Sequence, residues 1–137
     1  MANPFAHIEL STGDVSAAKK FYKRVFDWKL SDMPQMGYTL IDVGKGTGGG
    51  MQGKMSPDQP TGWLPYVEVD DVKKSMAKAI KAGATAMMDY QEIGEMGAIG
   101  IFTDPTGATI GIWAAAKKPA KKAPAKKAAK KAAKKKK

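Results

Sequence analysis

The chain contains no cysteine, which excludes disulfide bonds and thiolate metal sites. No apolar run approaches the roughly 20 residues that a membrane-spanning helix needs, so we expect no transmembrane segment. The first residues lack the charged and then apolar pattern of a signal peptide, and a cytoplasmic protein is therefore expected. Histidine occurs once, at His7, so imidazole groups for binding a metal are scarce.

Acidic residues are absent from segment 117–137, which contains 12 lysines. The other residues carry 11 basic and 13 acidic side chains, so the net charge of +10 comes from this segment alone. Residues 116–137 are rich in lysine, alanine and proline, and we expect a disordered tail. Its composition resembles the tails of linker histones and of some bacterial DNA-binding proteins.

That composition predicts non-specific contacts with DNA or RNA, and with them a possible association with the nucleoid. The lysines expected to make the contacts are Lys121, Lys122, Lys126, Lys127, Lys130 and Lys131. An anionic membrane surface would attract the same charges. A role in solubility alone is the third alternative for the tail.

Residues 5–26 and 62–83 share one pattern, offset by 57 positions and without a gap. In each, an alternating apolar stretch leads to an Asp-Val pair that begins at Asp14 or Asp71, and a stretch with helical periodicity follows. Aspartate is a typical helix N-cap. A strand that leads into a helix, present twice, indicates two copies of one supersecondary unit with a shared core and cleft.

Three further strand-like stretches follow the helix in each half. We expect helices over 14–26 and 71–82, the second ended by Gly83, and strands over 5–12, 27–32, 37–43, 46–52, 63–69, 84–90, 97–103 and 108–114. The sequence thus predicts an α+β fold in which two βαβββ modules, 4–52 and 62–114, form a cupped mixed sheet. Together the modules make up a domain of residues 1–115.

Two motifs add to the repeat: FYKRVFDWKL after the first helix and DPTGATIGIW at the last strand. With the paired modules they resemble the vicinal oxygen chelate superfamily, the group of glyoxalase I, bleomycin-resistance proteins and extradiol dioxygenases. The resemblance covers about residues 4–114. It implies a cup between the modules, often a homodimer, and frequently a divalent metal at the base of the cup. In such relatives the ligands are histidines or glutamates from the first and last strand of each module.

Most of these metal ligands have no counterpart in this sequence. His7 matches the first position, but its counterpart in the second module is Leu64, and Gly111 stands at the last position. The glycine-rich stretch that should hold the second ligand offers only Gln52 as a weak oxygen donor. One imidazole does not supply the three or four donors that a divalent ion requires. We therefore expect no metal and no cofactor in the cup.

Alternation along the strands assigns a set of side chains to the cup, because the other positions of the first strand pack under the helix. The set comprises His7, Glu9, Ser11, Leu64, Tyr66, Glu68, Thr109, Gly111 and Trp113, with Tyr38 and Trp63 near the rim. Such a wall is typical of a small-molecule pocket. We expect ligand contacts from His7, Glu9, Tyr66, Glu68 and Trp113, and an approach of the ligand to the backbone at glycines 48–50.

Three functions are compatible with these residues. The first is a metal-free domain that binds a small organic ligand and carries a nucleic-acid-binding tail. The second is a glyoxalase-type lyase or isomerase in which His7 and a cup glutamate, Glu9 or Glu68, act as acid and base. The third is a DNA-associated accessory protein with a vestigial cup. His7 can also be a structural residue, and the two glutamates can be solvated or share a proton or water.

Overall fold

The structure is a computed structural model that describes residues 2–116. Apart from Ala116, the predicted tail lies outside the described residues, and so do its candidate nucleic-acid contacts, Lys121, Lys122, Lys126, Lys127, Lys130 and Lys131. Within the described part, no helix is long and apolar enough to cross a membrane.

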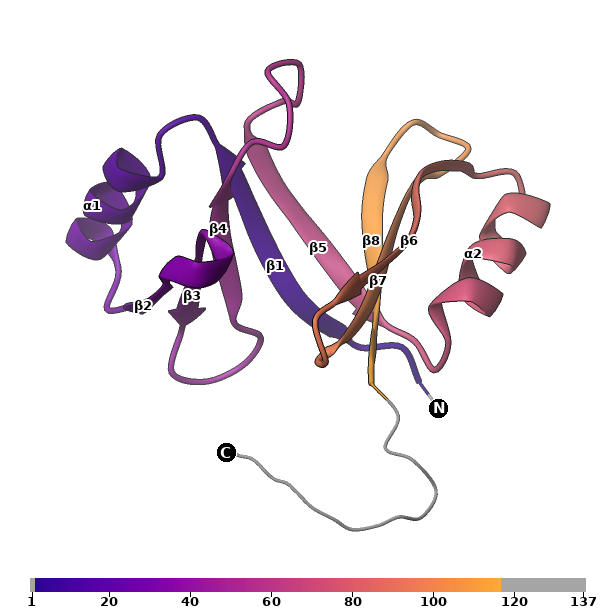
Figure 1. Ribbon diagram of the computed structural model, residues 1–137, viewed down its shortest axis with the longest axis horizontal. Coiled ribbons are helices and arrows are strands. Elements are labelled where there is room, and N and C mark those ends of the chain that lie inside the picture. The colour runs from indigo at the N-terminus through magenta and orange to yellow at the C-terminus, as the bar shows by residue number, and fades with distance from the viewer. Residues whose placement is uncertain (1, 117–137) are drawn as a thin grey trace, which may run out of the picture.

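Eight strands form one mixed sheet with the order β2-β3-β4-β1-β5-β8-β7-β6. The strands are β1 (Phe5–Thr12), β2 (Lys29–Met33), β3 (Tyr38–Asp42), β4 (Gly49–Gly53), β5 (Gly62–Glu68), β6 (Thr85–Ile93), β7 (Gly97–Thr103) and β8 (Thr109–Ala115). The helices are α1 (Val15–Val25), α2 (Val72–Lys81) and the short 3-10 helix η1 (Pro34–Met36). Figure 1 shows α1 and α2 at opposite ends of the molecule. The order of elements confirms the α+β fold of two βαβββ modules.

The first strands of the two modules, β1 and β5, lie antiparallel at the centre of the sheet. Each is also parallel to the last strand of its own module, β1 to β4 and β5 to β8. The register repeats the symmetry of the sequence: Glu9 is opposite Gly50, and Tyr66, 57 positions further on, is opposite Gly111. Equivalent residues of the two modules therefore meet at the centre.

Both long helices begin at the aspartates that the sequence predicted as N-caps. The Asp14 carboxylate accepts a hydrogen bond from the Ala17 amide at 3.0 Å, and Asp71 accepts one from the Lys74 amide at 3.1 Å. These bonds satisfy amides that lack a partner within the first turn. At the other end of α2, Gly83 has a φ of 111°, a left-handed conformation that glycine adopts without steric cost.

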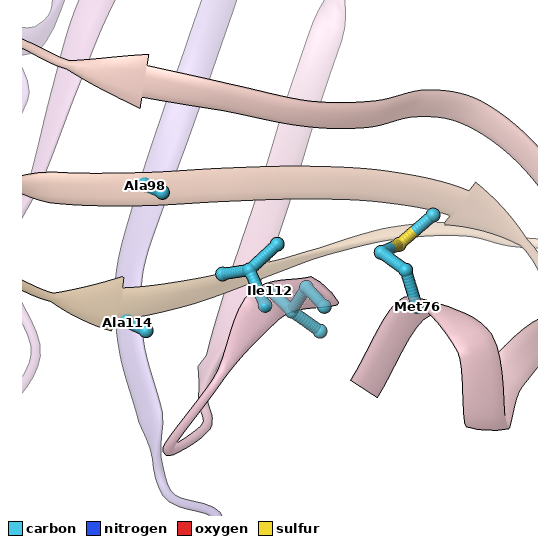
Figure 2. Close-up of a cluster of buried hydrophobic side chains, with 5 residues drawn as sticks. Met76, Ala98, Ile112 and Ala114 are labelled. Atoms are coloured by element: carbon cyan, nitrogen blue, oxygen red, sulfur yellow. The ribbon is translucent and has the colours of Figure 1, made fainter. Parts of the chain in front are cut away.

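Each helix covers its own hydrophobic cluster. Under α1 the buried residues are Leu10, Ile41 and Met51, and under α2 they are Val72, Met76, Ala98, Ile112 and Ala114. Figure 2 shows Met76 extending from α2 toward the sheet, and Ile112 of β8 belongs to the same cluster. Met51 and Met76 are the largest fully buried side chains, at 0% and 1% exposure.

The two helices lie on the same face of the sheet, which we call the outer face. Leu10 is opposite Trp63 in the β1–β5 pair, and by alternation Val67 shares their side of the sheet. Leu10 packs under α1, whereas Val67 packs against the cluster under α2. Residues at the intervening positions, His7 and Glu9 among them, project from the opposite face, called the inner face below.

Candidate functional site

Five side chains from four strands meet at the centre of the inner face, and we call them the polar cluster: His7, Glu9, Tyr38, Gln52 and Tyr66. His7 Nε2 lies 2.6 Å from the Tyr38 hydroxyl oxygen. The Tyr66 hydroxyl donates to Glu9 Oε1 at 3.1 Å, and the Gln52 amide donates to the same oxygen at 3.3 Å. The His7 ring stacks with Tyr38 and meets Tyr66 edge-on, with centroids 6.2 and 6.1 Å apart.

Strand pairing explains why these five residues converge. His7 is opposite Tyr66 across the β1–β5 pair, and Tyr38 is opposite Gln52 across the β3–β4 pair. Glu9 follows His7 by two positions, so both side chains leave β1 on the same face. Members of both modules are therefore brought together by backbone pairing alone.

Glycines provide the space for the two tyrosine rings. A Cβ atom at Gly50 would collide with the Tyr38 ring, and one at Gly111 would collide with the Tyr66 ring. A Cβ atom at Gly49 would meet the carbonyl of Ile8 on β1. The expectation that glycines 48–50 form an edge approached by a ligand is therefore corrected: β4 lies between β3 and β1, and its glycines admit the protein's own ring and backbone.

Burial sets the protonation states within the polar cluster. It lowers the pKa of His7, which favours the neutral imidazole. Burial also raises the pKa of Glu9, against the effect of hydrogen bonds from Tyr38 and Tyr66, which lower it. The pKa of each tyrosine is raised by burial and by the negative charge of Glu9, so both hydroxyls stay protonated and can donate.

No basic side chain balances the charge of Glu9 within the sheet centre. The four central strands, β4, β1, β5 and β8, contain neither lysine nor arginine. An ion pair of the described chain joins Lys19 and Asp32, at 2.7 Å and away from the cluster. The carboxylate of Glu9 is therefore held by neutral donors alone.

Two further residues predicted for the site lie on the inner face beside the cluster. Glu68 and Trp113 are opposite each other in the β5–β8 pair. The Trp113 ring lies against Gly97 at the start of β7, whereas the rings that contact His7 belong to tyrosines. The Glu68 side chain makes no hydrogen bond or ion pair with the rest of the described chain. Direct pairing of Glu9 with Glu68 is thus not what the structure shows.

Trp63 was expected near the rim of the cup but lies on the outer face. Its Nε1 donates to the Tyr22 hydroxyl at 3.3 Å, and its ring meets Tyr22 and Trp28 edge-on. The physical reason is the pleat, because Trp63 and Leu64 are adjacent and must project from opposite faces. Tyr38, also expected at the rim, instead lies at the centre of the cluster beside His7.

The inner face does not fit the divalent metal that the family resemblance implies. Within residues 2–116, no group of three or more histidine, cysteine, aspartate or glutamate side chains is arranged to hold a metal ion. The polar cluster supplies one imidazole and one carboxylate, from His7 and Glu9. At the last family ligand position, Gly111, the space is filled by the ring of Tyr66.

A separate hollow of about 370 Å³ lies beside α2 and includes Ala98 and Ala114 of the outer face. Its charged lining residues are Asp70, Asp71, Lys73, Glu92 and Glu95. Lys73 lies over the ring of Tyr90, with Nζ 4.6 Å from the centroid. No residue of the polar cluster lines this hollow, so the hollow is a different surface from the inner face.

Known proteins are similar to this chain in sequence or in fold. CFP32 of Mycobacterium tuberculosis, named as a glyoxylase, is 37% identical over 116 residues, which cover 79% of this chain but 44% of that protein. The chain thus spans less than half the length of this relative. Two solved structures share the fold at low identity. Protein BH1468 of Bacillus halodurans is 14% identical with a TM-score of 0.63, and the match covers 93% of this chain and 100% of that chain. A methylmalonyl-CoA epimerase in complex with methylmalonyl-CoA is 15% identical with a TM-score of 0.58, and the match covers 85% of this chain and 96% of that chain.

A family model matches residues 5–112, from the first residue of β1 into β8. Its range includes both modules and every member of the polar cluster. The expectation drawn from the two sequence motifs and the repeat is therefore confirmed: the chain belongs to the glyoxalase/bleomycin resistance protein/dioxygenase superfamily.

Proposed function

We propose that the inner face binds a small organic molecule without a metal ion, through the polar cluster and the apolar side chains around it. The observation that carries this proposal is the convergence of five polar or aromatic side chains from both modules. A few polar groups at fixed positions within an apolar wall are the usual composition of a small-molecule site.

The apolar wall follows from the strand register. Leu64 is opposite Glu9, Leu40 is opposite Gly50, and Ile101 is opposite Gly111, which places all three on the inner face. Leu40 is 42% exposed, a large fraction for a leucine within a sheet. A ligand over the cluster would remove this apolar surface from water, which contributes roughly 25 cal/mol per Å².

Relatives support a small ligand in this fold but do not identify it. One solved neighbour holds methylmalonyl-CoA, and CFP32 is named as a glyoxylase. The epimerase is 15% identical, so it supports the fold and not a ligand. CFP32 is more than twice as long as the matched part of this chain, so its name does not identify a substrate for this chain.

Metal analysis with ligand mapping tests the proposal. We expect purified protein to hold no stoichiometric divalent metal and to keep its melting temperature when a chelator is added. Metabolites that bind should shift the NMR resonances of His7, Glu9 and Tyr66. Stoichiometric zinc, nickel, iron or manganese whose removal lowers the melting temperature would contradict a metal-free site.

Acid–base catalysis is the second candidate function, and the short His7–Tyr38 contact favours it. A neutral imidazole held at 2.6 Å from a hydroxyl is oriented to accept or return a proton. Glu9 would be the second group of such a pair. The test is turnover of the hemithioacetal of methylglyoxal and glutathione by wild type and by His7→Ala. Turnover that is lost in the variant supports the enzyme, and equal turnover in both ends it.

The lysine-rich tail is proposed to bind nucleic acid without reading its sequence. If half of its 12 lysines contact phosphates, the logarithm of the binding constant should fall with the logarithm of salt concentration with a slope of about −5. Removal of residues 117–137 should abolish retention on DNA of two unrelated sequences. Retention that persists in this variant would exclude both a DNA-binding tail and an accessory protein led by it.

A further inference from the structure

Glu9 carries a charge on the inner face that its neighbours in the described chain do not balance. Its hydrogen-bond donors are the amide of Gln52 and the hydroxyl of Tyr66, both of them neutral. The four strands at the sheet centre contain no lysine or arginine. A charge removed from water is costly unless it is paired, so a cation that bound here would gain more than a neutral molecule.

Glu9 also retains hydrogen-bonding capacity for a ligand. An ionised carboxylate offers about four acceptor sites. The bonds from Gln52 and Tyr66 both go to Oε1, and Tyr38 accounts for at most one more site. At least one acceptor site therefore remains for a donor that the described chain does not supply.

The groups around Glu9 suit the other parts of an organic cation. The rings of Tyr38 and Tyr66 flank His7 beside the carboxylate, and the negative face of an aromatic ring attracts ammonium groups. Leu64, opposite Glu9, belongs to the apolar wall that would cover a hydrophobic body. Carboxylate, rings and apolar wall thus lie side by side on one face.

We infer that the inner face selects organic cations, in the form of a protonated amine on a compact apolar or aromatic body, with the ammonium group donating to Glu9. This inference rests on the proposed function and adds the charge class of the ligand. Anionic compounds, including CoA thioesters and glutathione adducts, would meet the charge of Glu9 with no lysine or arginine on the central strands to receive their own.

Three probes of similar shape and different charge test the inference on the full-length chain: benzylamine, benzyl alcohol and benzoate. Dissociation constants are measured by NMR titration, with shifts followed at His7 and Tyr66. A charge-assisted hydrogen bond is about twice as strong as a neutral one, so we expect benzylamine to bind about tenfold more tightly than benzyl alcohol. Benzoate should bind more weakly than the alcohol.

Glu9→Gln provides the matched comparison, because it removes the charge and keeps the shape. In this variant benzylamine should lose its advantage and bind like benzyl alcohol, while affinity for the alcohol stays within about twofold. Glu92→Gln is the control, since it removes one charge from the outer-face hollow and should leave all three affinities unchanged.

The outcomes separate the two proposals. Benzyl alcohol or benzoate binding at the polar cluster as tightly as benzylamine would overturn the selection of cations and leave a small-molecule site in place. An equal loss for all three probes in Glu9→Gln would do the same. If no probe, nor any compound of the metabolite screen, shifts the resonances of the cluster, the small-molecule site itself fails and the inference falls with it.

Discussion

Glu9 and Tyr66 stand at equivalent positions of the two modules, and the hydroxyl of one donates to the carboxylate of the other at 3.1 Å. Their strand partners are also equivalent, since Gly50 is opposite Glu9 and Gly111 is opposite Tyr66. The repeat has thus diverged at the point where its two copies meet, into an acceptor in one copy and a donor in the other.

Removing the donor of this pair should destabilise the protein and shift the titration of the acceptor. Tyr66→Phe leaves the Glu9 carboxylate with one bond fewer, and we expect a loss of about 1–2 kcal/mol in the free energy of unfolding near neutral pH. The pKa of Glu9 should rise further above its usual value, because a bond to the charged form is lost.

Urea unfolding and a carbon-13 NMR titration of Glu9 measure the two effects. Tyr90→Phe is the matched control, because the hydrogen bond from the Tyr90 hydroxyl to Glu92 is long, at 3.5 Å, and lies at an exposed site. A pKa of Glu9 that is unchanged in Tyr66→Phe would show that the hydrogen bond does not act on the carboxylate.

Alanine at Gly111 should destabilise the protein, because its Cβ would displace the Tyr66 ring. Forcing extra volume into a filled space typically costs about 1–3 kcal/mol. Gly53→Ala is the control, since no atom lies within 4 Å of a Cβ built there. A smaller residue at 66, as in Tyr66→Leu, should reduce the penalty at position 111. Equal unfolding free energies for Gly111→Ala and Gly53→Ala would contradict the packing described here.

The contribution of His7 to the stability of the protein should fall as the pH drops below the ordinary pKa of histidine, 6.5. Because burial lowers the pKa of His7 in the folded state, the unfolded chain binds the proton more tightly. The contribution is complete above pH 6.5 and decreases as the pH falls from 6.5 toward the lower, folded value.

We therefore expect His7→Asn to lose less stability than wild type on acidification, measured by urea unfolding about one pH unit above and below 6.5. The histidine resonances of the folded wild type should titrate below 6.5. An identical pH dependence in variant and wild type would show that His7 is not the group responsible.

Truncation of the core under α2 should be costly. Met76 is 1% exposed and packs within the cluster that Figure 2 shows. Met76→Ala should lower the free energy of unfolding by about 2–5 kcal/mol through lost burial and a residual cavity. Met87→Ala, at a residue that is 63% exposed, should change it by less than about 0.5 kcal/mol.

Most of the fold could be predicted from two periodicities. Alternation located the strands, and helical spacing behind Asp14 and Asp71 located the helices, because these patterns follow directly from backbone geometry. Element ends were less exact: β4 begins at Gly49 and not at 46, and the short helix η1 (Pro34–Met36) was not predicted. Glycines and short turns give no periodic signal, so the ends of the elements that contain them depend on tertiary pairing.

The candidate site was only partly predictable. Alternation placed His7, Glu9 and Tyr66 on one face, and the structure brings these three together. The sequence analysis named Tyr38 as a rim residue and Gln52 as a weak oxygen donor, but did not predict that they join the cluster. A residue's neighbours on adjacent strands depend on strand order and register. The sequence contains no local signal for either, although two βαβββ units in a known order would have allowed the pairing of β3 with β4 to be inferred.

The antiparallel β1–β5 pair has a consequence for how a binding surface comes into existence. The five residues of the polar cluster come from both halves of the polypeptide: four precede the loop that follows Gly53, and Tyr66 comes after this loop. A chain split in that loop would yield fragments that each lack a complete surface. Reconstitution would then create the hydrogen bond between Glu9 and Tyr66 anew, which makes ligand affinity a reporter of assembly.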